Sequence, residues 1–290
     1  MDYLSHVRDA VNYIESNLDR DIKAMDVAQE AAFSRYHFHR IFIALVGRSV
    51  TDYIRRRRLT EAAYELVGSD RKIIDIALDY QFETPESFTR AFKKMYGLTP
   101  RQYRKQGENV EYLHQTKLNE NILRHLKGGF TMEPKIVTKD GFKIVGMKIF
   151  GENTNDEIKE LWNKFIPRID KIKHRLNKDI TKDISYGMCY PSEEMNESGE
   201  FEYIASVEVS SLGDVPQGMV GRTIPRQKYA VFTHKGVVDR IKETYKYIYG
   251  TWQPKSGCEL VRAPDFEYYD ERFDADNQED SEMDIYIPIK

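Results

Sequence analysis

Two segments of the chain, about fifty residues apart, carry side chains of the kinds that contact double-stranded DNA. They hold Arg35, Tyr36, His39 and Arg40 in the first segment and Glu86, Ser87, Thr89 and Arg90 in the second. Arginine can donate two hydrogen bonds to a guanine edge, and histidine, tyrosine and hydroxyl side chains can donate to bases or phosphates. Glu86 could accept from a cytosine amino group or repel phosphates. We therefore expect two DNA-reading segments, with Arg90 holding a phosphate.

Helices must position these side chains. Apolar residues at helical spacing predict a short helix over residues 22–31, a tight turn, and a further helix that begins after Ser34 and runs to about Leu45. In this second helix we expect the four polar side chains of the first segment along one side, opposite Phe38 and Phe42. Two helices joined by a short turn are typical of a helix-turn-helix.

The same pattern occurs twice within the first hundred residues. At an offset of 49, Ala28 matches Ala77 and Phe33 matches Phe82. At an offset of 50, the matches pair Phe38 with Phe88, Arg40 with Arg90, Phe42 with Phe92, Gly47 with Gly97, Ser49 with Thr99 and Tyr53 with Tyr103. A long helix over residues 51–67 would separate the copies by roughly 25 Å at ~1.5 Å per residue, about one turn of DNA. The repeat therefore favours DNA reading over the alternative of solvated helix faces.

The motifs of this duplicated unit resemble the DNA-binding domain of AraC/XylS-type transcription regulators. The resemblance covers residues 5–107 and rests on Phe38-His39-Arg40-Ile41-Phe42, Asp75-Ile76-Ala77, Ser87-Phe88-Thr89-Arg90-Ala91-Phe92-Lys93-Lys94 and Gly97-Leu98-Thr99-Pro100-Arg101-Gln102-Tyr103-Arg104. The N-terminal position of the unit and the phrase Ala77-Leu78-Asp79-Tyr80-Gln81-Phe82 are most similar to the Rob subgroup. The resemblance implies an all-α, homeodomain-like double helix-turn-helix that binds DNA.

Some positions depart from the family pattern. The family often has glycine at the turns, where this chain has Ala32 and Gln81, so we expect local strain or a different turn. Lys23 stands where the family often has a capping Ser or Thr. The four arginines at residues 55–58 cannot share one helix face, so some of them should cap helices or pair with acidic side chains.

After a polar linker over residues 108–130, strands and helices are predicted in a repeated order. The first pass has a strand near 144–151, a helix over 156–176 kinked at Pro167, and strands at 185–190 and 201–209. The second pass has a strand at 226–234, a helix at 238–252, and strands at 259–269 and 283–289. We therefore predict an α+β domain of two strand-helix-strand-strand repeats over residues 131–290, separate from a DNA-binding domain over residues 1–107.

This tandem layout resembles the GyrI-like small-molecule-binding domain. The resemblance rests on Tyr229-Ala230-Val231-Phe232, Thr251-Trp252, Pro264-Asp265-Phe266-Glu267-Tyr268-Tyr269 and Ile285-Tyr286-Ile287-Pro288-Ile289. It implies two repeats about a pseudo-twofold axis and an acidic residue in an aromatic-lined cleft, which Glu267 matches. A carboxylate among Phe266, Trp162 and Trp252 would suit an apolar organic cation. The alternatives are that the tryptophans are core residues and that Glu267 forms a surface ion pair.

Composition narrows the class of protein further. With 40% hydrophobic and 31% charged residues the chain is globular, and without an apolar run of ~18 residues or an export signal we expect it in the cytoplasm. Cys189 and Cys258 are expected to be reduced thiols, and we expect no metal or other cofactor. The first 107 residues carry 18 basic and 15 acidic side chains, and the rest carry 26 and 32, which suggests surfaces with different partners.

These features predict a sequence-specific transcription regulator, an activator, whose C-terminal domain senses a small, cationic and lipophilic molecule. The expected partners are double-stranded DNA, a small-molecule effector and RNA polymerase, with no membrane. Two alternatives stay open: a hydrolase that uses the cleft glutamate as acid or base, and a module that sequesters a basic protein. We favour a non-enzyme, because His174 and His234 lie outside any recognisable catalytic constellation.

Overall fold

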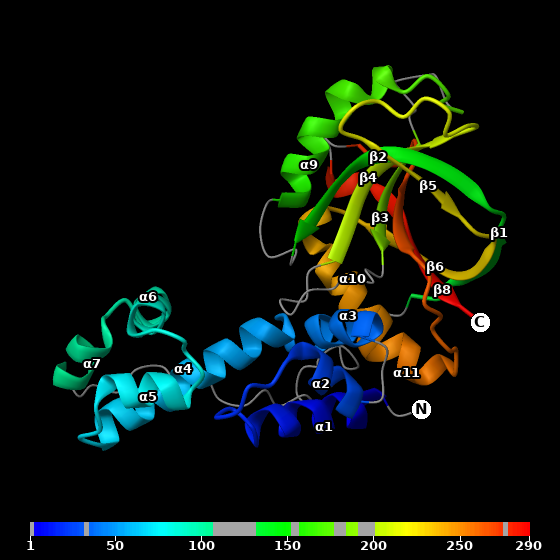
Figure 1. The fold of residues 1–290 in the computed structure, drawn as a ribbon. Helices are drawn as coiled ribbons and strands as arrows, with labels where there is room; N and C mark the ends of the chain where they lie inside the picture. Colours follow the sequence, from blue (N-terminus) through cyan, green and yellow to red (C-terminus); the bar gives the residue numbers. More distant parts are fainter. Residues whose placement is uncertain are drawn as a thin grey trace. The chain divides into compact units, whose positions relative to one another are not determined.

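The computed structural model describes residues 3–31, 35–106, 132–151, 157–176, 184–190, 201–274 and 278–290. The chain divides into two compact units, whose described parts are residues 3–106 and 132–290 (Figure 1). The first unit is helical, and the second contains one β-sheet with helices packed on it. Within the described ranges, no helix is long and apolar enough to cross a membrane.

The helical unit is the predicted double helix-turn-helix. Its described helices are α1 (Tyr3–Glu15), α2 (Ala24–Glu30), α3 (Arg35–Val46), α4 (Val50–Gly68), α5 (Ile73–Asp79), α6 (Pro85–Tyr96) and α7 (Pro100–Gln106). Helices α2 and α3 form the first copy, and α5 and α6 form the second. The long helix α4 begins at Ser49, whose hydroxyl accepts the backbone N–H of Asp52.

Equivalent rings build the cores of the two copies. The ring centroids of Phe38 and Phe42 lie 5.4 Å apart, and those of their counterparts Phe88 and Phe92 lie 5.5 Å apart. A tyrosine packs edge-on against the second phenylalanine of each pair. The ring centroids of Tyr53 and Phe42 lie 5.8 Å apart, and those of Tyr103 and Phe92 lie 5.2 Å apart. The repeat seen in the sequence is thus a repeat of core packing.

The second turn has the expected unusual backbone. Gln81 has a φ of +62°, in the left-handed region that favours glycine. Its backbone N–H donates to the carbonyl of Leu78, and the next N–H, of Phe82, donates to the carbonyl of Ala77, which closes the end of α5. The Gln81 side chain also donates to the carbonyl of Asp19 at 2.6 Å. Ala32, the corresponding residue of the first turn, lies outside the described residues.

Three of the four consecutive arginines have structural contacts, as predicted. Arg57 is buried and forms ion pairs of 2.7 Å with both Glu15 and Glu61. Arg58 donates to the carbonyl of Leu18 in the turn after α1, and Arg56 pairs with Asp52. The contacts of Arg57 and Arg58 fasten α4 to α1 and to the turn that follows it, and Arg55 is the exposed member of the run.

The second unit is built on one antiparallel sheet with the strand order β1-β6-β8-β7-β3-β4-β2-β5. Its strands are β1 (Lys135–Lys139), β2 (Phe142–Gly151), β3 (Ser185–Tyr190), β4 (Phe201–Val209), β5 (Val220–Ile224), β6 (Gln227–Lys235), β7 (Asp265–Tyr269) and β8 (Glu282–Ile289). Its helical segments are α9 (Glu157–Phe165), η1 (Ile166–Lys171), η3 (Val238–Arg240), α10 (Ile241–Tyr247), η4 (Ile248–Trp252), α11 (Gln253–Ser256) and η5 (Gln278–Asp280).

Two strand-helix-strand-strand repeats are present, as predicted. They run from β2 through α9 to β4, and from β6 through α10 to β8. Helix α9 changes to a 3-10 helix next to Pro167, where the sequence predicted a kink. Two strands were not predicted from the sequence: β1 and β5 precede the repeats, and each pairs with the first strand of the other repeat. Strand β7 begins six residues later than predicted.

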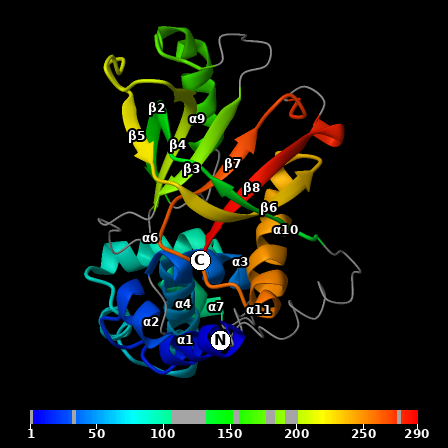
Figure 2. The ribbon, with the colours of Figure 1, turned by 90° about the vertical axis from the view of Figure 1, so that its right-hand side faces the viewer.

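The middle of the sheet shows a twofold relationship between the repeats. Strands β3 and β7 lie side by side there (Figure 2). Their five paired positions run from Ser185 with Tyr269 to Cys189 with Asp265, so that Gly187 with Glu267 is the central pair. The neighbouring strands continue the symmetry, because Gly187 pairs with Ala205 on one side and Glu267 pairs with Ile285 on the other.

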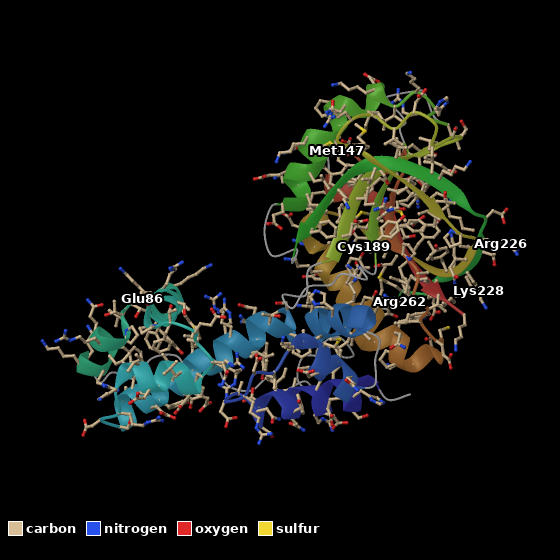
Figure 3. The ribbon with its side chains drawn as sticks, in the orientation of Figure 1. Glu86, Met147, Cys189, Arg226, Lys228 and Arg262 are labelled. Atoms are coloured by element: carbon tan, nitrogen blue, oxygen red, sulfur yellow. The ribbon has the colours of Figure 1, made fainter. Side chains whose placement is uncertain are left out.

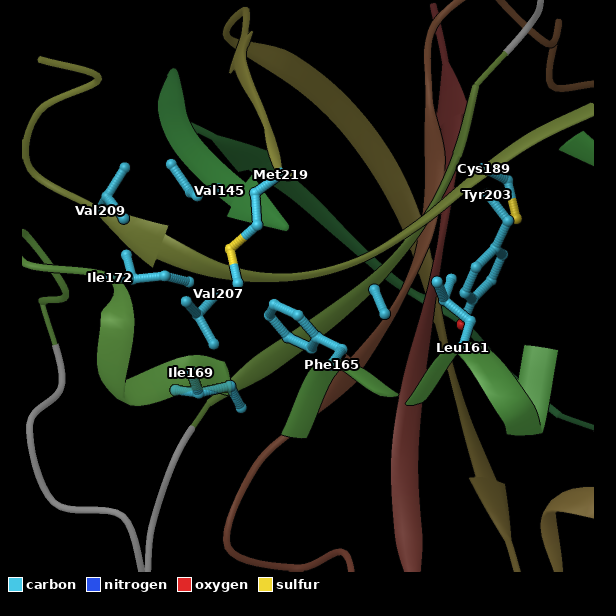
Figure 4. Close-up of a cluster of buried hydrophobic side chains, with 11 residues drawn as sticks. Val145, Leu161, Phe165, Ile169, Ile172, Cys189, Tyr203, Val207, Val209 and Met219 are labelled. Atoms are coloured by element: carbon cyan, nitrogen blue, oxygen red, sulfur yellow. The ribbon is translucent and has the colours of Figure 1, made fainter. Parts of the chain in front are cut away.

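The two faces of the sheet have different contents. On the helix face, Leu161 and Phe165 of α9 pack with Val145 and Val207 of the sheet (Figure 4). On the opposite face, here called the aromatic face, side chains of both repeats gather in one buried cluster. Its rings include those of Phe142, Tyr186, Tyr229 and Phe266. Neighbouring residues of a strand point to opposite faces, so each strand contributes to both clusters.

Candidate functional site

Helix α3 carries the first set of predicted DNA contacts. Arg40 is half-buried on this helix, and the side chains of Arg35 and Tyr36 lie outside the described part of the chain. His39 was expected on the polar side, and this expectation is wrong: its exposed fraction is 4%. The buried arc of α3 is wide because this helix packs against α1, α2 and α4, so residue 39 joins Phe38 and Phe42 in the core.

Burial changes the chemistry of His39. Desolvation, and to a lesser degree the charge of Arg40, lowers the pKa of His39 to about 4. Its Nε2 atom has no hydrogen-bond partner among the described residues. The ring is therefore neutral at pH 7 and belongs to the core of the first helix-turn-helix.

Helix α6 presents the second set. Glu86 and Arg90 are exposed one turn apart, and Thr89 is half-buried (Figure 3 shows Glu86). Ser87 has a structural task, since its hydroxyl donates to the carbonyl of Thr84 at 2.8 Å and its N–H donates to the Thr84 hydroxyl at 3.1 Å. With Pro85 in the first turn, this reciprocal cap fixes where α6 begins.

Glu267 is the centre of a hydrogen-bonded cluster on the helix face. Its side chain is buried, with an exposed fraction of 8%. The hydroxyls of Tyr203 and Tyr269 donate to Oε2 at 2.8 and 2.9 Å, and the Tyr245 hydroxyl donates to Oε1 at 3.3 Å. These donors come from β4, β7 and α10, so the fold brings three separate elements to one carboxylate. The alternative that Glu267 forms a surface ion pair is wrong.

The three tyrosines were not predicted from the sequence, for different reasons. Tyr269 is two residues from Glu267 on the same strand, so strand alternation would have placed it on the same face. Tyr203 and Tyr245 reach the carboxylate only through strand pairing and helix packing, which local spacing does not reveal. Burial, with the charge of Glu267 as a second cause, raises the pKa of both Tyr203 and Tyr269, so they remain protonated donors.

Trp162 also contacts this cluster. Its indole Nε1 donates to the Tyr203 hydroxyl at 3.2 Å, so one chain of hydrogen bonds runs from α9 to Glu267. The indole also packs edge-on to Tyr269, with ring centroids 5.4 Å apart. Trp162 is half-buried and therefore combines a core contact with a place beside the carboxylate.

The two other predicted residues have different neighbours. Phe266 is on the aromatic face, because it neighbours Glu267 on β7 and must point to the opposite side. Its inclusion beside the carboxylate was wrong. Trp252 packs edge-on to Phe232, with ring centroids 4.9 Å apart. Phe232 pairs with Ile285, which pairs with Glu267, so the ring that Trp252 contacts belongs to β6, two strands away from β7.

A second acidic residue accompanies Glu267 on the helix face. Asp265 is two residues earlier on β7 and is buried. Burial, and then the charge of Glu267, raises the pKa of Asp265 well above its usual range. In the described parts of the chain, no lysine, arginine or histidine forms an ion pair with Glu267. The cluster thus holds one carboxylate without a cationic partner from those parts.

The histidines considered for catalysis do not contact Glu267. His234 Nδ1 lies 2.7 Å from the Thr244 hydroxyl, and His174 Nε2 lies 3.7 Å from a carboxylate oxygen of Asp214. Among the residues that the structure describes, no group of three or more His, Cys, Asp or Glu side chains could hold a metal ion.

Comparison with protein families agrees with both units. A GyrI-like small-molecule-binding domain matches residues 132–290, and a helix-turn-helix domain matches residues 27–106. The chain belongs to the AraC-type regulators with a GyrI-like domain. It is accordingly a DNA-binding transcription regulator. Nothing in these matches supports the hydrolase alternative.

Individual relatives match different parts of this regulator. The transcriptional regulator BrlR of Pseudomonas aeruginosa is 41% identical over 158 residues, which cover 54% of this chain and 56% of BrlR. The right origin-binding protein of Escherichia coli is 28% identical over the full length of both chains. The transcriptional activator AarP of Providencia stuartii is 40% identical over 100 residues, which cover 34% of this chain and 74% of AarP.

Proposed function

We propose that this regulator binds a lipophilic organic cation beside Glu267 and that the bound cation controls transcription from the DNA held by the helical unit. The observation that carries the proposal is the buried Glu267 carboxylate, which accepts three tyrosine hydroxyls and has no cationic partner in the described parts of the chain. We infer that the domain boundaries are residues 1–107 and 131–290, joined by a linker over residues 108–130.

The cluster has the chemistry that such a cation needs. A buried carboxylate attracts a positive charge more strongly than an exposed one, because little water screens it. Trp162, Tyr203, Tyr245 and Tyr269 belong to the same hydrogen-bonded cluster, and we infer that their rings supply cation–π contacts. A large organic cation gives up little hydration free energy when it enters such surroundings, whereas a small metal ion gives up much more. The cluster therefore favours lipophilic organic cations over small metal ions.

For the DNA complex, we propose that α3 and α6 enter successive major grooves. Arg35, Tyr36 and Arg40 would contact DNA from α3, and Glu86, Thr89 and Arg90 from α6. Two reading helices in one chain need no symmetry partner, so the chain should bind a non-palindromic site as a monomer. Because its DNA partner is the chromosome, we place the protein in the cytoplasm. The activator AarP is 40% identical over 100 residues of this chain, which supports activation through contact with RNA polymerase.

Calorimetric titration of the full chain tests the effector proposal. The probes are tetraphenylphosphonium and tetraphenylborate, which have the same shape and opposite charge. We expect the cation alone to bind, and Glu267→Gln to weaken its binding by roughly tenfold or more, because a buried charge interaction of ~1.5–3 kcal/mol is lost. Glu243→Gln, which removes an exposed charge from α10, is the matched control. Equal cation affinities in the wild type and the Glu267→Gln variant would overturn the proposal.

A further inference from the structure

A second cluster of rings, on the aromatic face, already holds an ammonium group. The Lys139 Nζ atom lies over the ring of Phe142, 4.7 Å from the centroid. The same atom lies 5.7 Å from the ring centroid of Tyr186 and 6.0 Å from that of Tyr268. All three distances fall within the range of cation–π attraction. We call these three rings the aromatic cage.

The cage is assembled from distant parts of the sheet. Lys139 ends β1, and the three rings stand on β2, β3 and β7. Phe142 and Tyr186 are almost completely buried, whereas Tyr268 is half-buried at the edge of the cluster. Glu267 points to the other face of β7, so this cage is separate from the cluster described above.

The electrostatics of the cage favour a cation. The Tyr186 hydroxyl donates to Glu208 Oε2 at 2.6 Å, which places a negative charge beside the rings and leaves the Tyr186 ring electron-rich. Burial, followed by this hydrogen bond, raises the pKa of Tyr186, so the phenol stays protonated. A carboxylate next to these aromatic rings makes a region of negative potential without placing an acceptor over the ring centres.

Lys139 suits the cage incompletely. Its ammonium carries three N–H donors, yet in the described parts of the chain its Nζ atom has no hydrogen-bond acceptor and no ion-pair partner. An N–H donor over a ring face gives up hydrogen bonds to water without replacing them. A quaternary ammonium has the same charge and no N–H to satisfy, so it matches a cage of rings better than a primary ammonium does.

We propose that the aromatic cage is a second ligand site of this domain, specific for a small, free quaternary ammonium ion, and that Lys139 occupies it when the ligand is absent. The ligand displaces the Lys139 ammonium into solvent and takes its place over Phe142, Tyr186 and Tyr268. Because the lysine is tethered beside the cage, it competes with the ligand and lowers the apparent affinity in proportion to its occupancy.

Calorimetric titration of the full chain that carries Glu267→Gln tests the aromatic cage while the site beside Glu267 is disabled. The probes are choline, its uncharged isostere 3,3-dimethylbutan-1-ol, and ethanolamine as the primary ammonium. We expect choline to bind in preference to both others. Lys139→Met should tighten choline binding about tenfold, as removal of a competitor that fills the cage nine-tenths of the time would do. Lys135→Met, which removes an exposed charge from the same strand, should leave the affinity unchanged.

Variants of Tyr268, the most exposed of the three cage rings, test whether the aromatic rings bind the ligand. Tyr268→Leu should weaken choline binding at least tenfold, whereas Tyr268→Phe keeps a ring and should retain it, and circular dichroism checks that both variants fold. Phosphatidylcholine vesicles carry the same trimethylammonium group on a lipid surface, and we expect no co-sedimentation because two cage rings are buried. The proposal is overturned if Lys139→Met binds choline no more tightly than the parent, if the uncharged isostere binds equally well, or if vesicles bind instead of free choline.

Discussion

Gly187 faces Glu267 across the central pair of β3 and β7, and its missing side chain makes the room that the carboxylate cluster occupies. A Cβ atom at residue 187 would lie 2.7 Å from Oε2 of Glu267 and would overlap the Tyr203 hydroxyl. The two residues are equivalent under the twofold relationship of the repeats. The second repeat therefore supplies the Glu267 carboxylate, and the first repeat has Gly187 at the equivalent position, which leaves room for it. The central pair thus holds a single carboxylate.

Gly187→Ala should disturb this cluster. The added methyl group must push Tyr203 or Glu267 aside, which we expect to cost ~1–3 kcal/mol of stability, as overpacking of a well-packed core does. Urea unfolding of the full chain measures this cost, and binding of tetraphenylphosphonium should weaken in parallel. Gly213→Ala is the control, because the nearest atom to its added Cβ would be the Ser211 hydroxyl at 3.5 Å. If both variants unfolded at the wild-type urea concentration, the tight fit at residue 187 would be disproved.

The buried His39 should make the helical unit sensitive to acid. Its pKa is about 4 in the folded protein and 6.5 as the ordinary value, so between these pH values the unfolded chain binds a proton that the folded chain does not. Stability should therefore be intact above pH 6.5 and should fall by up to ~3 kcal/mol as the pH drops to 4. Urea unfolding at several pH values measures this loss. His39→Phe should flatten that part of the profile, and an unchanged slope would contradict a neutral, buried imidazole.

The equivalent arginines of the two reading helices should differ in their effects on DNA binding. Arg40→Ala should relax base preference under the first helix-turn-helix, at a cost of ~1–3 kcal/mol if Arg40 reads a guanine, while Arg90→Ala should weaken all sequences more evenly. Selection from a random DNA pool, followed by titration of the selected sites, separates the two outcomes. Wild-type affinity and selectivity in both variants would show that α3 and α6 do not read the DNA.

The helical unit was predictable because its information is local and repeated. Matching phenylalanines at an offset of 50 predicted one core twice, and both cores have nearly the same ring geometry. His39 was misplaced because helical spacing gives the direction of a side chain but not the width of the buried arc. That width depends on how many helices pack around α3, which no local pattern contains.

The sheet unit was predictable in its order of elements but not in its pairings. The exchange of β1 and β5 between repeats joins residues that are ninety or so positions apart along the chain, such as Val137 and Tyr229. Glu267 was found through a motif, whereas its donor Tyr203 comes from β4, which does not pair with β7. Phe266 shows the opposite case, since strand alternation alone would have excluded it from the carboxylate cluster.

In the proposed mechanism, a cation beside Glu267 controls transcription. Its most direct test is transcription in vitro with purified RNA polymerase, from a promoter that contains the selected DNA site, with and without tetraphenylphosphonium. We predict that the cation changes transcript yield several-fold with the wild-type regulator and leaves it unchanged with the Glu267→Gln variant, although both bind the site with equal affinity in the absence of the cation. An equal response of the two proteins to the cation would contradict the account.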